Sequence, residues 1–588
     1  MKKKHLQYSI ILLSFLFISS YYCTDLTGLA FGTKRVGLPA AFGDFNSDEL
    51  TDLFVIRKNE KGSSVEILLG STKEPYFNSV GLVCNYSQRV VSVVPGDFDG
   101  DALMDMLVIA TPIPPNGFLN NGYIAWGNVT SLECIDEPLF QIMDEPLAID
   151  FSKNMKADLF GVNKTGSRVL WLFNSSRVSP QEIPLKLPST ALCELRTPHS
   201  HAFLDLNGDN WPDLYLTSKC GFEVWLWDND ASTFNYNNTI KSVPVDSSVV
   251  GQTLFMDLET ADELNQIVPV TNGRNSSLLV YLDGEWHDLN VNFKGPKNQW
   301  AFLLPGMGAF PDTLTLHAGD FNNDGFVDIL ATLAQAVNMD QRGVFLFENV
   351  PCSKNCKISR TFEIQWNALE PFGTNSVMGI FYDFMQDGIL DIIFVKQEKD
   401  KKIMSAFKND LDYDANFIKV MVITGLTNDK IDLPPTLLGT KRHVFGSNLA
   451  GPKIRYKTTT QDGTSRTGVA VQLPQSAHLA LYLPYTIFGL GRTPNFIEDL
   501  TISLFNKSRT WNQIIPNSQL IVAPKGEPSQ WTAQLFVTPS KIVLQTVVAL
   551  TGTCIVIGCI IAMLHWKERK EDRIERLQEA HRFHFDAM

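Results

Sequence analysis

Clusters of acidic residues recur along the chain with a fixed internal spacing. The first complete cluster, DFNSDELTD at residues 44–52, places oxygen-bearing side chains at positions 1, 3, 5 and 9. A hard dication such as calcium takes about six to eight oxygen ligands from a flexible loop, and the carbonyl at position 7 can supply one more. Carboxylates crowded into one short loop repel each other, and a bound cation resolves that repulsion. The pattern therefore predicts a calcium-binding loop.

Four copies of the cluster are complete, and each is predicted to bind one calcium ion. Isolated clusters of Asp, Asn and Gly often serve only turn geometry, but four complete copies at regular spacing are hard to explain in that way. The predicted ligands, with the position-7 residue contributing its carbonyl, are Asp44, Asn46, Asp48, Leu50 and Asp52; Asp97, Asp99, Asp101, Leu103 and Asp105; Asp205, Asn207, Asp209, Trp211 and Asp213; and Asp320, Asn322, Asp324, Phe326 and Asp328.

Three further copies are incomplete. The copy at Asp383 keeps Asp387 and Asp391 but has Met385 at position 3, so weak metal binding is expected there. In the copy at Asp150, nearby lysines oppose a cation, and the copy at Asp257 has no closing acid. We therefore expect calcium as the cofactor at about four sites, a weak fifth site at Asp383, and structural turns elsewhere.

The spacing of the seven copies predicts the fold. Their leading acids stand at 44, 97, 150, 205, 257, 320 and 383, so each unit is 52 to 63 residues long. Each loop is followed by short β-branched and aromatic runs, such as 53–56 and 65–69, which are typical of strands. A unit of this size with about four strands matches a propeller blade. The chain is predicted to be all-β, with a seven-bladed β-propeller over residues 24–409.

The blade pattern stops near residue 409. Alternating runs at 453–456, 469–473, 478–483 and 500–505 predict a membrane-proximal β-sandwich over residues 410–539.

Two apolar segments predict export and membrane anchoring. Three lysines and an apolar run at the start indicate a signal peptide over residues 1–23. Residues 542–564 lack charged side chains and are long enough to cross a bilayer as a transmembrane helix. Basic residues follow this span at once, so the tail 565–588 is expected in the cytoplasm and the large N-terminal part outside the cell. The net charge of −13 argues against nucleic acid as a partner.

Sequons and cysteines agree with an extracellular location. Glycosylation is predicted at seven sequons, Asn85, Asn128, Asn163, Asn174, Asn237, Asn275 and Asn506. Six cysteines on the same side are disulfide candidates: Cys84, Cys134, Cys193, Cys220, Cys352 and Cys356. Pairing each with its nearest neighbour (84 with 134, 193 with 220, 352 with 356) is one of 15 connectivities that the sequence allows.

The acidic repeat resembles the FG-GAP repeat of integrin α-subunit propellers, including the Phe42-Gly43 pair. The whole chain, with its terminal string EAHRFHFDAM at 579–588, resembles the T-cell immunomodulatory protein and linkin family. This resemblance implies a cell-surface adhesion or recognition glycoprotein with a connection to T-cell modulation. It also implies that the calcium loops lie on one propeller face and that recognition uses the opposite face.

We find no catalytic motif and expect a protein that is not an enzyme. His199 and His201, at alternate positions before the loop at Asp205, are interpreted as one surface face of a strand rather than a site. The expected partners are an extracellular or cell-surface protein, the membrane itself, and a protein that binds the cytoplasmic tail. The alternative is a propeller hydrolase or carbohydrate-binding protein acting outside the cell, and strongly raised acid pKa values outside the loops would favour it.

Overall fold

The computed structural model describes residues 23–585, except 61, 114–118, 244–248, 304–313, 339, 354–356, 400, 411–414, 429, 432, 434–443, 446–448, 461, 475–479, 493–495 and 539–540. The predicted signal peptide up to residue 22 therefore lies outside the described residues. The described chain divides into two compact units, residues up to Phe536 and residues from Val537 onward.

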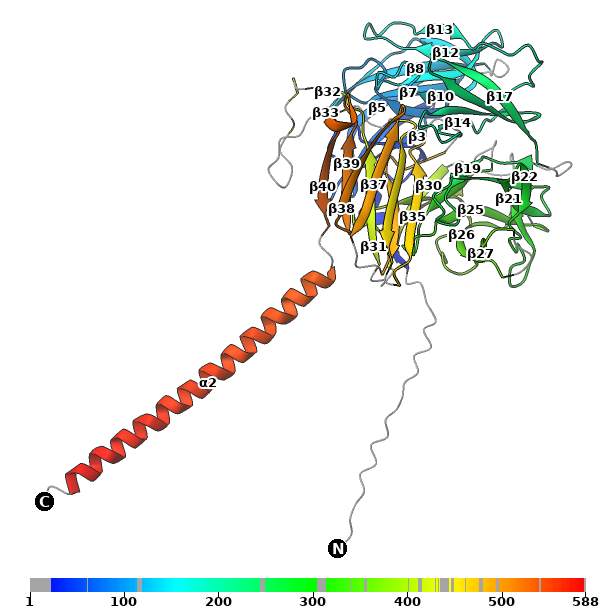
Figure 1. Ribbon diagram of the computed structural model, residues 1–588. Helices are drawn as coiled ribbons and strands as arrows, with labels where there is room; N and C mark the ends of the chain where they lie inside the picture. Colours follow the sequence, from blue (N-terminus) through cyan, green and yellow to red (C-terminus); the bar gives the residue numbers. More distant parts are fainter. Residues whose placement is uncertain are drawn as a thin grey trace. The chain divides into compact units, whose positions relative to one another are not determined.

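The seven repeats form the seven antiparallel blades of a propeller, so the predicted fold class is confirmed (Figure 1). The first blade contains β2 (Leu38–Gly43), β3 (Asp52–Lys58), β4 (Ser63–Gly70) and β5 (Phe77–Tyr86). The fourth contains β14 (Ala202–Leu204), β15 (Asp213–Ser218), β16 (Gly221–Asp228) and β17 (Thr233–Lys241). The fifth contains β18 (Val249–Val250), β19 (Leu254–Met256), β20 (Asn265–Thr271), β21 (Ser276–Leu282) and β22 (Glu285–Asp288). The sixth contains β23 (Trp300–Phe302), β24 (Leu316–Gly319), β25 (Asp328–Gln335), β26 (Arg342–Pro351) and β27 (Arg360–Gln365).

The second and third blades share one sheet. They contain β6 (Arg89–Gly96), β7 (Asp105–Thr111), β8 (Leu119–Asn128) and β9 (Ser131–Cys134), then β10 (Phe140–Ile149), β11 (Asp158–Asn163), β12 (Arg168–Leu172) and β13 (Gln181–Pro184). Residues 140–143 of β10 pair with β8, and residues 142–149 pair with β11, with a register shift in the second pairing between Met143 and Leu147. One strand therefore completes the second blade and begins the third.

The ring is closed by the start of the chain. The seventh blade consists of β28 (Ser376–Tyr382), β29 (Asp391–Glu398), β30 (Lys401–Asn409) and the N-terminal strand β1 (Cys23–Asp25). Cys23 pairs with Asn409 and Asp25 with Phe407. A short helix, α1 (Thr27–Phe31), follows and buries Phe31 against Phe77 and Phe384. The last blade thus takes its outer strand from the other end of the propeller sequence.

Each acidic loop joins the strand that ends just before its leading acid to the strand that begins at position 9, and the register is the same in every blade. The residue before the leading acid pairs with the residue at position 9 in all seven blades: Gly43 with Asp52, Gly96 with Asp105, Ile149 with Asp158, Leu204 with Asp213, Met256 with Asn265, Gly319 with Asp328, and Tyr382 with Asp391. The seven loops therefore emerge from equivalent positions, on the same face of the ring.

The glycine directly before the leading acid has a packing role in the first and sixth blades. A Cβ on Gly43 would lie 2.8 Å from the Met104 sulfur, and one on Gly319 would lie 2.6 Å from Leu390. Met104 and Leu390 each occupy position 8 of the next loop in the ring. Glycine at these two positions lets neighbouring blades approach closely.

The segment after the propeller is a β-sandwich. One sheet contains β36 (Thr486–Gly491), β31 (Asn416–Val422), β39 (Ser518–Ala523) and β40 (Thr532–Val537); the other contains β35 (Ser465–Val471), β34 (Lys453–Thr459), β37 (Ile497–Leu504) and β38 (Lys507–Ile514). A small pair, β32 (Thr427–Asn428) and β33 (Val444–Phe445), and a 3-10 helix, η1 (Pro528–Gln530), complete it. Ile418, Val420 and Val422 of β31 pack against Ile454 and Tyr456 of the other sheet in the sandwich core.

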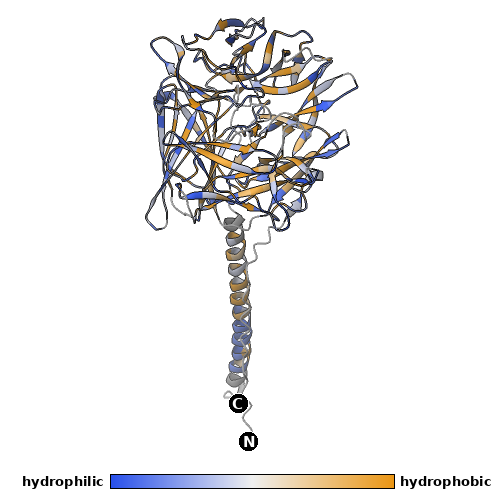
Figure 2. Cartoon of the chain, turned by 90° about the vertical axis from the view of Figure 1, so that its right-hand side faces the viewer, coloured by the Kyte–Doolittle hydropathy of each residue, from blue (hydrophilic) through white to orange (hydrophobic). Residues whose placement is uncertain are grey.

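The second unit is mainly one helix, α2 (Lys541–Phe585). The part of this helix from Thr546 to Ala580 contains a window of mean hydropathy 2.6. In the described part of the chain, α2 is the helix that is long and apolar enough to cross a membrane. Figure 2 shows the apolar first part of this helix and its hydrophilic C-terminal part. The chain therefore carries one candidate membrane span near its C-terminus.

Two of the guessed disulfides are confirmed. Cys84 is bonded to Cys134, and Cys193 is bonded to Cys220. The first bond joins β5 of the first blade to β9 of the second, and so links two neighbouring outer strands. Cys352 is also disulfide-bonded, and its predicted partner Cys356 lies outside the described residues.

Candidate metal-binding loops

All seven loops share one hydrogen-bonded turn. The carboxylate at position 1 accepts a hydrogen bond from the backbone N–H of position 6 in every copy, namely from Glu49, Ala102, Met155, Asn210, Asp262, Gly325 and Gly388. The position-6 residue has a positive φ in each loop, between 64° and 86°. The leading acid thus fixes the turn in complete and incomplete loops alike.

The acid at position 9 also has a structural role. In the first loop the Asp52 carboxylate accepts N–H groups from Phe45 at 2.7 Å and Gly70 at 2.7 Å. Equivalent pairs of N–H donors serve Asp105, Asp213, Asp328 and Asp391. Asn265 stands at this position in the fifth loop, where its Oδ1 accepts the Leu258 N–H at 3.0 Å. Asn265 was not among the residues predicted from the sequence to have a role in the loops.

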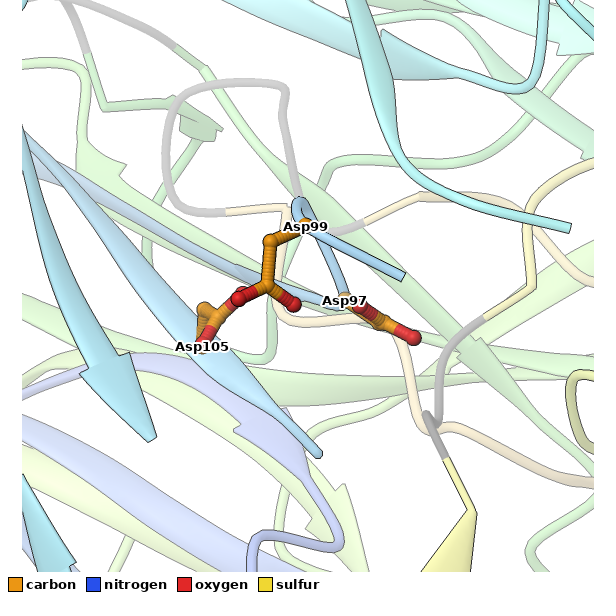
Figure 3. Close-up of side chains that lie close together, drawn as sticks. All are labelled: Asp97, Asp99 and Asp105. Carbon is orange, nitrogen blue, oxygen red and sulfur yellow. The ribbon is translucent and has the colours of Figure 1, made fainter. Parts of the chain in front are cut away.

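The second loop brings three predicted ligands together. Asp97, Asp99 and Asp105 are buried, and one oxygen of each lies within 4.8 Å of the others (Figure 3). A cation from the chain also reaches this loop, because Arg177 contacts Asp99 at 2.6 Å and Asp101 at 3.1 Å. Arg177, which the sequence analysis missed, partly neutralises the loop.

The first and sixth loops also bury their leading and closing acids. Asp44 and Asp52 are fully buried, and Asp320 and Asp328 nearly so. In a loop without a cation, burial and then the nearby Asp48 hold the pKa of Asp44 well above its usual range. Burial likewise raises the pKa of Asp97 to about 7, and burial with the Asp324 charge raises that of Asp320 to about 8. The ionised forms of these acids therefore need a positive partner.

The four complete loops fit calcium by the chemistry of their donors. Each offers side-chain oxygens at positions 1, 3, 5 and 9, which suits a hard cation. The fourth loop is the most open of them, since Asn207 and Asp209 are exposed. Its leading acid, Asp205, lies 3.5 Å from Lys453 of the β-sandwich.

The incomplete loops depart from this donor set in different ways. In the third loop, Ser152 donates both its N–H and its hydroxyl to Asp158. In the seventh loop, Met385 brings no oxygen, and Lys419 of β31 lies 3.3 Å from Asp383. Of the predicted ligands Asp383, Asp387 and Asp391, the leading acid Asp383 thus contacts an internal cation that was not predicted from the sequence.

The β-sandwich domain covers the loop face of the propeller. Its groups reach the leading acids of four consecutive blades. Two are lysines: Lys453 contacts Asp205, and Lys419 contacts Asp383. Two are backbone N–H groups: that of Val469 donates to Asp257 at 3.3 Å, and that of Gly489 donates to Asp320 at 3.1 Å. It also bonds the first loop through Phe445 and Ser47, and the second through Asn428 and Asp101. Met155 of the third loop packs on the sandwich core. All seven loops therefore contact the following domain.

A segment of the same domain enters the ring. Ala480 hydrogen-bonds His317 of the sixth blade, Leu481 packs with residues of the first and seventh blades, and Tyr482 packs with the fourth and fifth. Residues 480–485, which come directly before β36, do not form a strand. The prediction of a strand over 478–483 is therefore wrong for the residues of that run that the structure describes. The segment is surrounded by apolar side chains of several blades and has no sheet neighbour to pair with.

The histidine pair is a core feature, not a surface face as predicted. His199 and His201 are 2 % and 7 % exposed, and their rings stack 4.1 Å apart. Nδ1 of His199 accepts the His201 N–H, and Nδ1 of His201 accepts the Thr217 N–H. Burial, with the neighbouring His199, holds the pKa of His201 well below its usual value. Both rings serve the fold.

The sequons differ in accessibility. Asn85, Asn128, Asn174, Asn237, Asn275 and Asn506 are exposed. Asn163 is 7 % exposed, its Oδ1 accepts the N–H groups of Thr165 and Ser167, and its amide nitrogen donates to Glu182. This geometry suits a turn residue whose side chain is held by the fold, in contrast to the six exposed sequons.

Comparison with known proteins agrees with this architecture. A family model described as "ITFG1, C2 domain" matches residues 444–536, within the β-sandwich. The chain is 37% identical to the mouse T-cell immunomodulatory protein over 96% of this chain and 94% of that protein, and 36% identical to the human protein with the same coverage. It is 27% identical to linkin of Caenorhabditis elegans over 94% and 96% of the two chains. The chain belongs to the T-cell immunomodulatory protein family.

Proposed function

We propose that this protein is a single-pass cell-surface glycoprotein that recognises an extracellular partner through the propeller face opposite the loops. The observation that carries the proposal is that the loop face is covered by the chain's own β-sandwich, which contacts all seven loops. The acidic loops then act inside the molecule, and calcium bound there would brace the blades and the docked domain.

The opposite face carries exposed apolar side chains. Val36, Ile113, Leu187 and Val337 are 41 % to 95 % exposed. Each lies in a connection at the ends of the strands remote from the acidic loops. Exposed apolar residues on the connections of several blades are suited to a protein partner. Modulation of T cells, which the names of the relatives suggest, is the biological role we propose for this contact.

The orientation follows from the charges that flank the span. Lys567, Arg569, Lys570 and Arg573 come directly after the apolar part of α2, so the tail is proposed to be cytoplasmic and the propeller extracellular. The exposed sequons on the propeller side are then available for glycosylation.

Recognition is favoured over hydrolysis by where the perturbed acids lie. Among the described residues, the Asp and Glu side chains with raised pKa all lie in the acidic loops, except Glu348. Glu348 accepts a hydrogen bond from Asn322 of the sixth loop. A pair of tuned carboxylates on the uncovered face, which a hydrolase would need, does not occur in this described set.

Binding to cells tests the proposal. A fluorescent tetramer of residues 23–538 should label a subset of leukocytes, and Leu187→Asp or Val337→Asp should reduce labelling at least tenfold. Leu535→Asp, on exposed β40 of the sandwich, is the matched control and should label like the parent. Equal loss in all three variants, or turnover of a glycoside by the parent, would contradict the proposed role.

A further inference from the structure

The seventh loop lacks the donors that a calcium site needs. Position 3 is Met385, whose thioether is a poor ligand for a hard cation. The turn itself is intact, because Asp383 accepts the N–H of Asp387 at 3.1 Å and of Gly388 at 3.3 Å. The backbone of a calcium loop is therefore present with a reduced set of metal ligands.

A lysine of the β-sandwich enters this loop. Lys419 Nζ lies 3.3 Å from Asp383 Oδ2 and 2.6 Å from Gln386 Oε1, and 3.9 Å from the centre of the Tyr485 ring. The side chains of Lys419 and Asp383 are 3 % and 0 % exposed. An ammonium group has three N–H donors. A carboxylate, an amide oxygen and the face of an aromatic ring therefore satisfy its donors and charge.

The strand that carries Lys419 has two different faces. Ile418, Val420 and Val422 point into the sandwich core. Phe417 and Met421 belong to an apolar cluster with Phe321, Phe381 and Ile392 of the propeller. Since side chains alternate along a strand, Lys419 lies on the propeller-facing side between two apolar residues. The sequence places one charge at the centre of an otherwise apolar contact.

We propose that the Lys419 ammonium is the resident cation of the seventh loop, and that this loop is a docking site for the β-sandwich instead of a calcium site. The contrast with the other loops rests on the calcium binding proposed above, whereas the ion pair stands on geometry alone. Where a dication would join two parts of one loop, the lysine joins the closing blade of the propeller to the domain that follows it.

The fourth loop shows what distinguishes the seventh. Lys453 also approaches a leading acid, at 3.5 Å from Asp205, but its side chain is 26 % exposed and the loop keeps Asn207, Asp209 and Asp213. An exposed lysine beside a complete donor set competes weakly with calcium. A buried lysine beside an incomplete set has no such competitor.

Calcium content of the full-length chain in detergent micelles tests the first half of the proposal. Asp48→Asn and Asp387→Asn change the same position, position 5, in the first and seventh loops. By mass spectrometry of the dialysed protein, we expect Asp48→Asn to lose one calcium per chain and Asp387→Asn to lose none. Loss of one calcium in Asp387→Asn would overturn the assignment.

A double-mutant cycle in chelator tests the ion pair without calcium. Lys419→Met and Asp383→Asn should each lower the thermal midpoint by several degrees, because each leaves a buried charge without its partner. The double variant should lose clearly less than the sum of the two. The matched cycle, Lys453→Met with Asp205→Asn, should be close to additive. Additive losses at Lys419 and Asp383 would refute the docking role.

The two experiments separate this inference from the proposed function. If the parent contained no calcium, the calcium part of the proposed function would fail, and the cycle in chelator would still decide whether Lys419 and Asp383 are coupled. Coupling without calcium would leave the docking role standing.

Discussion

The first and seventh loops have the same backbone and different chemistry. In both, the leading acid accepts the N–H of position 6, and the closing acid accepts one N–H from position 2 and one from the last residue of the third strand. The first loop adds Asn46 and Asp48, which give a full set of oxygens. The seventh has Met385 and receives Lys419.

The comparison of the first and seventh loops separates two roles of the acidic motif, which are holding the turn and binding a metal. Positions 1 and 9 hold the turn, which explains why an oxygen-bearing side chain stands at both even in the third and fifth loops. Positions 3 and 5 decide whether a metal can bind. In an acidic repeat, the residues at positions 1 and 9 are therefore evidence for the blade, and the residues at positions 3 and 5 are evidence for calcium binding.

Calcium removal should have the largest effect. A ligand at 100 times its dissociation constant adds about 2.7 kcal/mol per independent site, so chelation should lower the thermal midpoint of the whole chain strongly. Asp324→Asn, in the sixth loop, should remove part of the calcium-dependent shift. An unchanged midpoint in chelator would abolish the distinction between the first and seventh loops.

Loss of the closing acid should affect both loops alike. Asp52→Ala and Asp391→Ala each leave two buried N–H groups unsatisfied, at about 1–3 kcal/mol per group, so each should cost on the order of 3 kcal/mol. Chemical denaturation in chelator measures this cost. If only Asp52→Ala were destabilising, the shared turn would not be the common structural element.

The metal-free protein should become less stable as pH rises toward neutrality. Asp97 and Asp320 have pKa values of about 7 and 8 in the folded chain, and near 4 when unfolded, so the folded state binds more protons between these limits. The free energy of unfolding then falls with rising pH, by up to about 2 kcal/mol for Asp97 between about pH 5.5 and 7. Saturating calcium should flatten this slope, and denaturation at several pH values with and without calcium would show it. A slope that calcium leaves unchanged would mean that other groups cause it.

The smallest effect is expected at the second loop. Arg177→Met removes a partly exposed cation from Asp99 and Asp101, a contact worth about 1 kcal/mol or less. Calcium should therefore bind this loop up to about fivefold more tightly, as a calorimetric titration would detect. Weaker binding in the variant would show that Arg177 shapes the loop instead of competing with the ion.

Much of the propeller could be predicted because its evidence repeats. Seven loops at regular spacing predict seven blades, and the strand after each loop begins at the position-9 residue, as in Asp52 of β3 and Asp391 of β29. The disulfide pairs Cys84–Cys134 and Cys193–Cys220 followed from proximity in sequence.

Contacts that occur once had no such signal. Lys419 lies in an alternating run with Phe417 and Met421, and nothing in that run indicates which blade it faces. The run 478–483 was predicted as a strand, but its described residues pack among several blades that are far apart in the sequence. His199 and His201 were misplaced because alternation indicates two faces of a strand without saying which face is buried.

The closing strand β1 makes the order of synthesis matter. Residues 23–25 must wait for residues 407–409 before they can pair, which at about 5–20 residues per second is roughly 20 to 80 seconds. Until then, the blades that are already synthesised form an open ring, and β1 lacks its pairing partner β30. The predicted signal peptide ends at residue 23, the first residue of this strand, so a mature chain that began after Asp25 would lack the outer strand of the seventh blade.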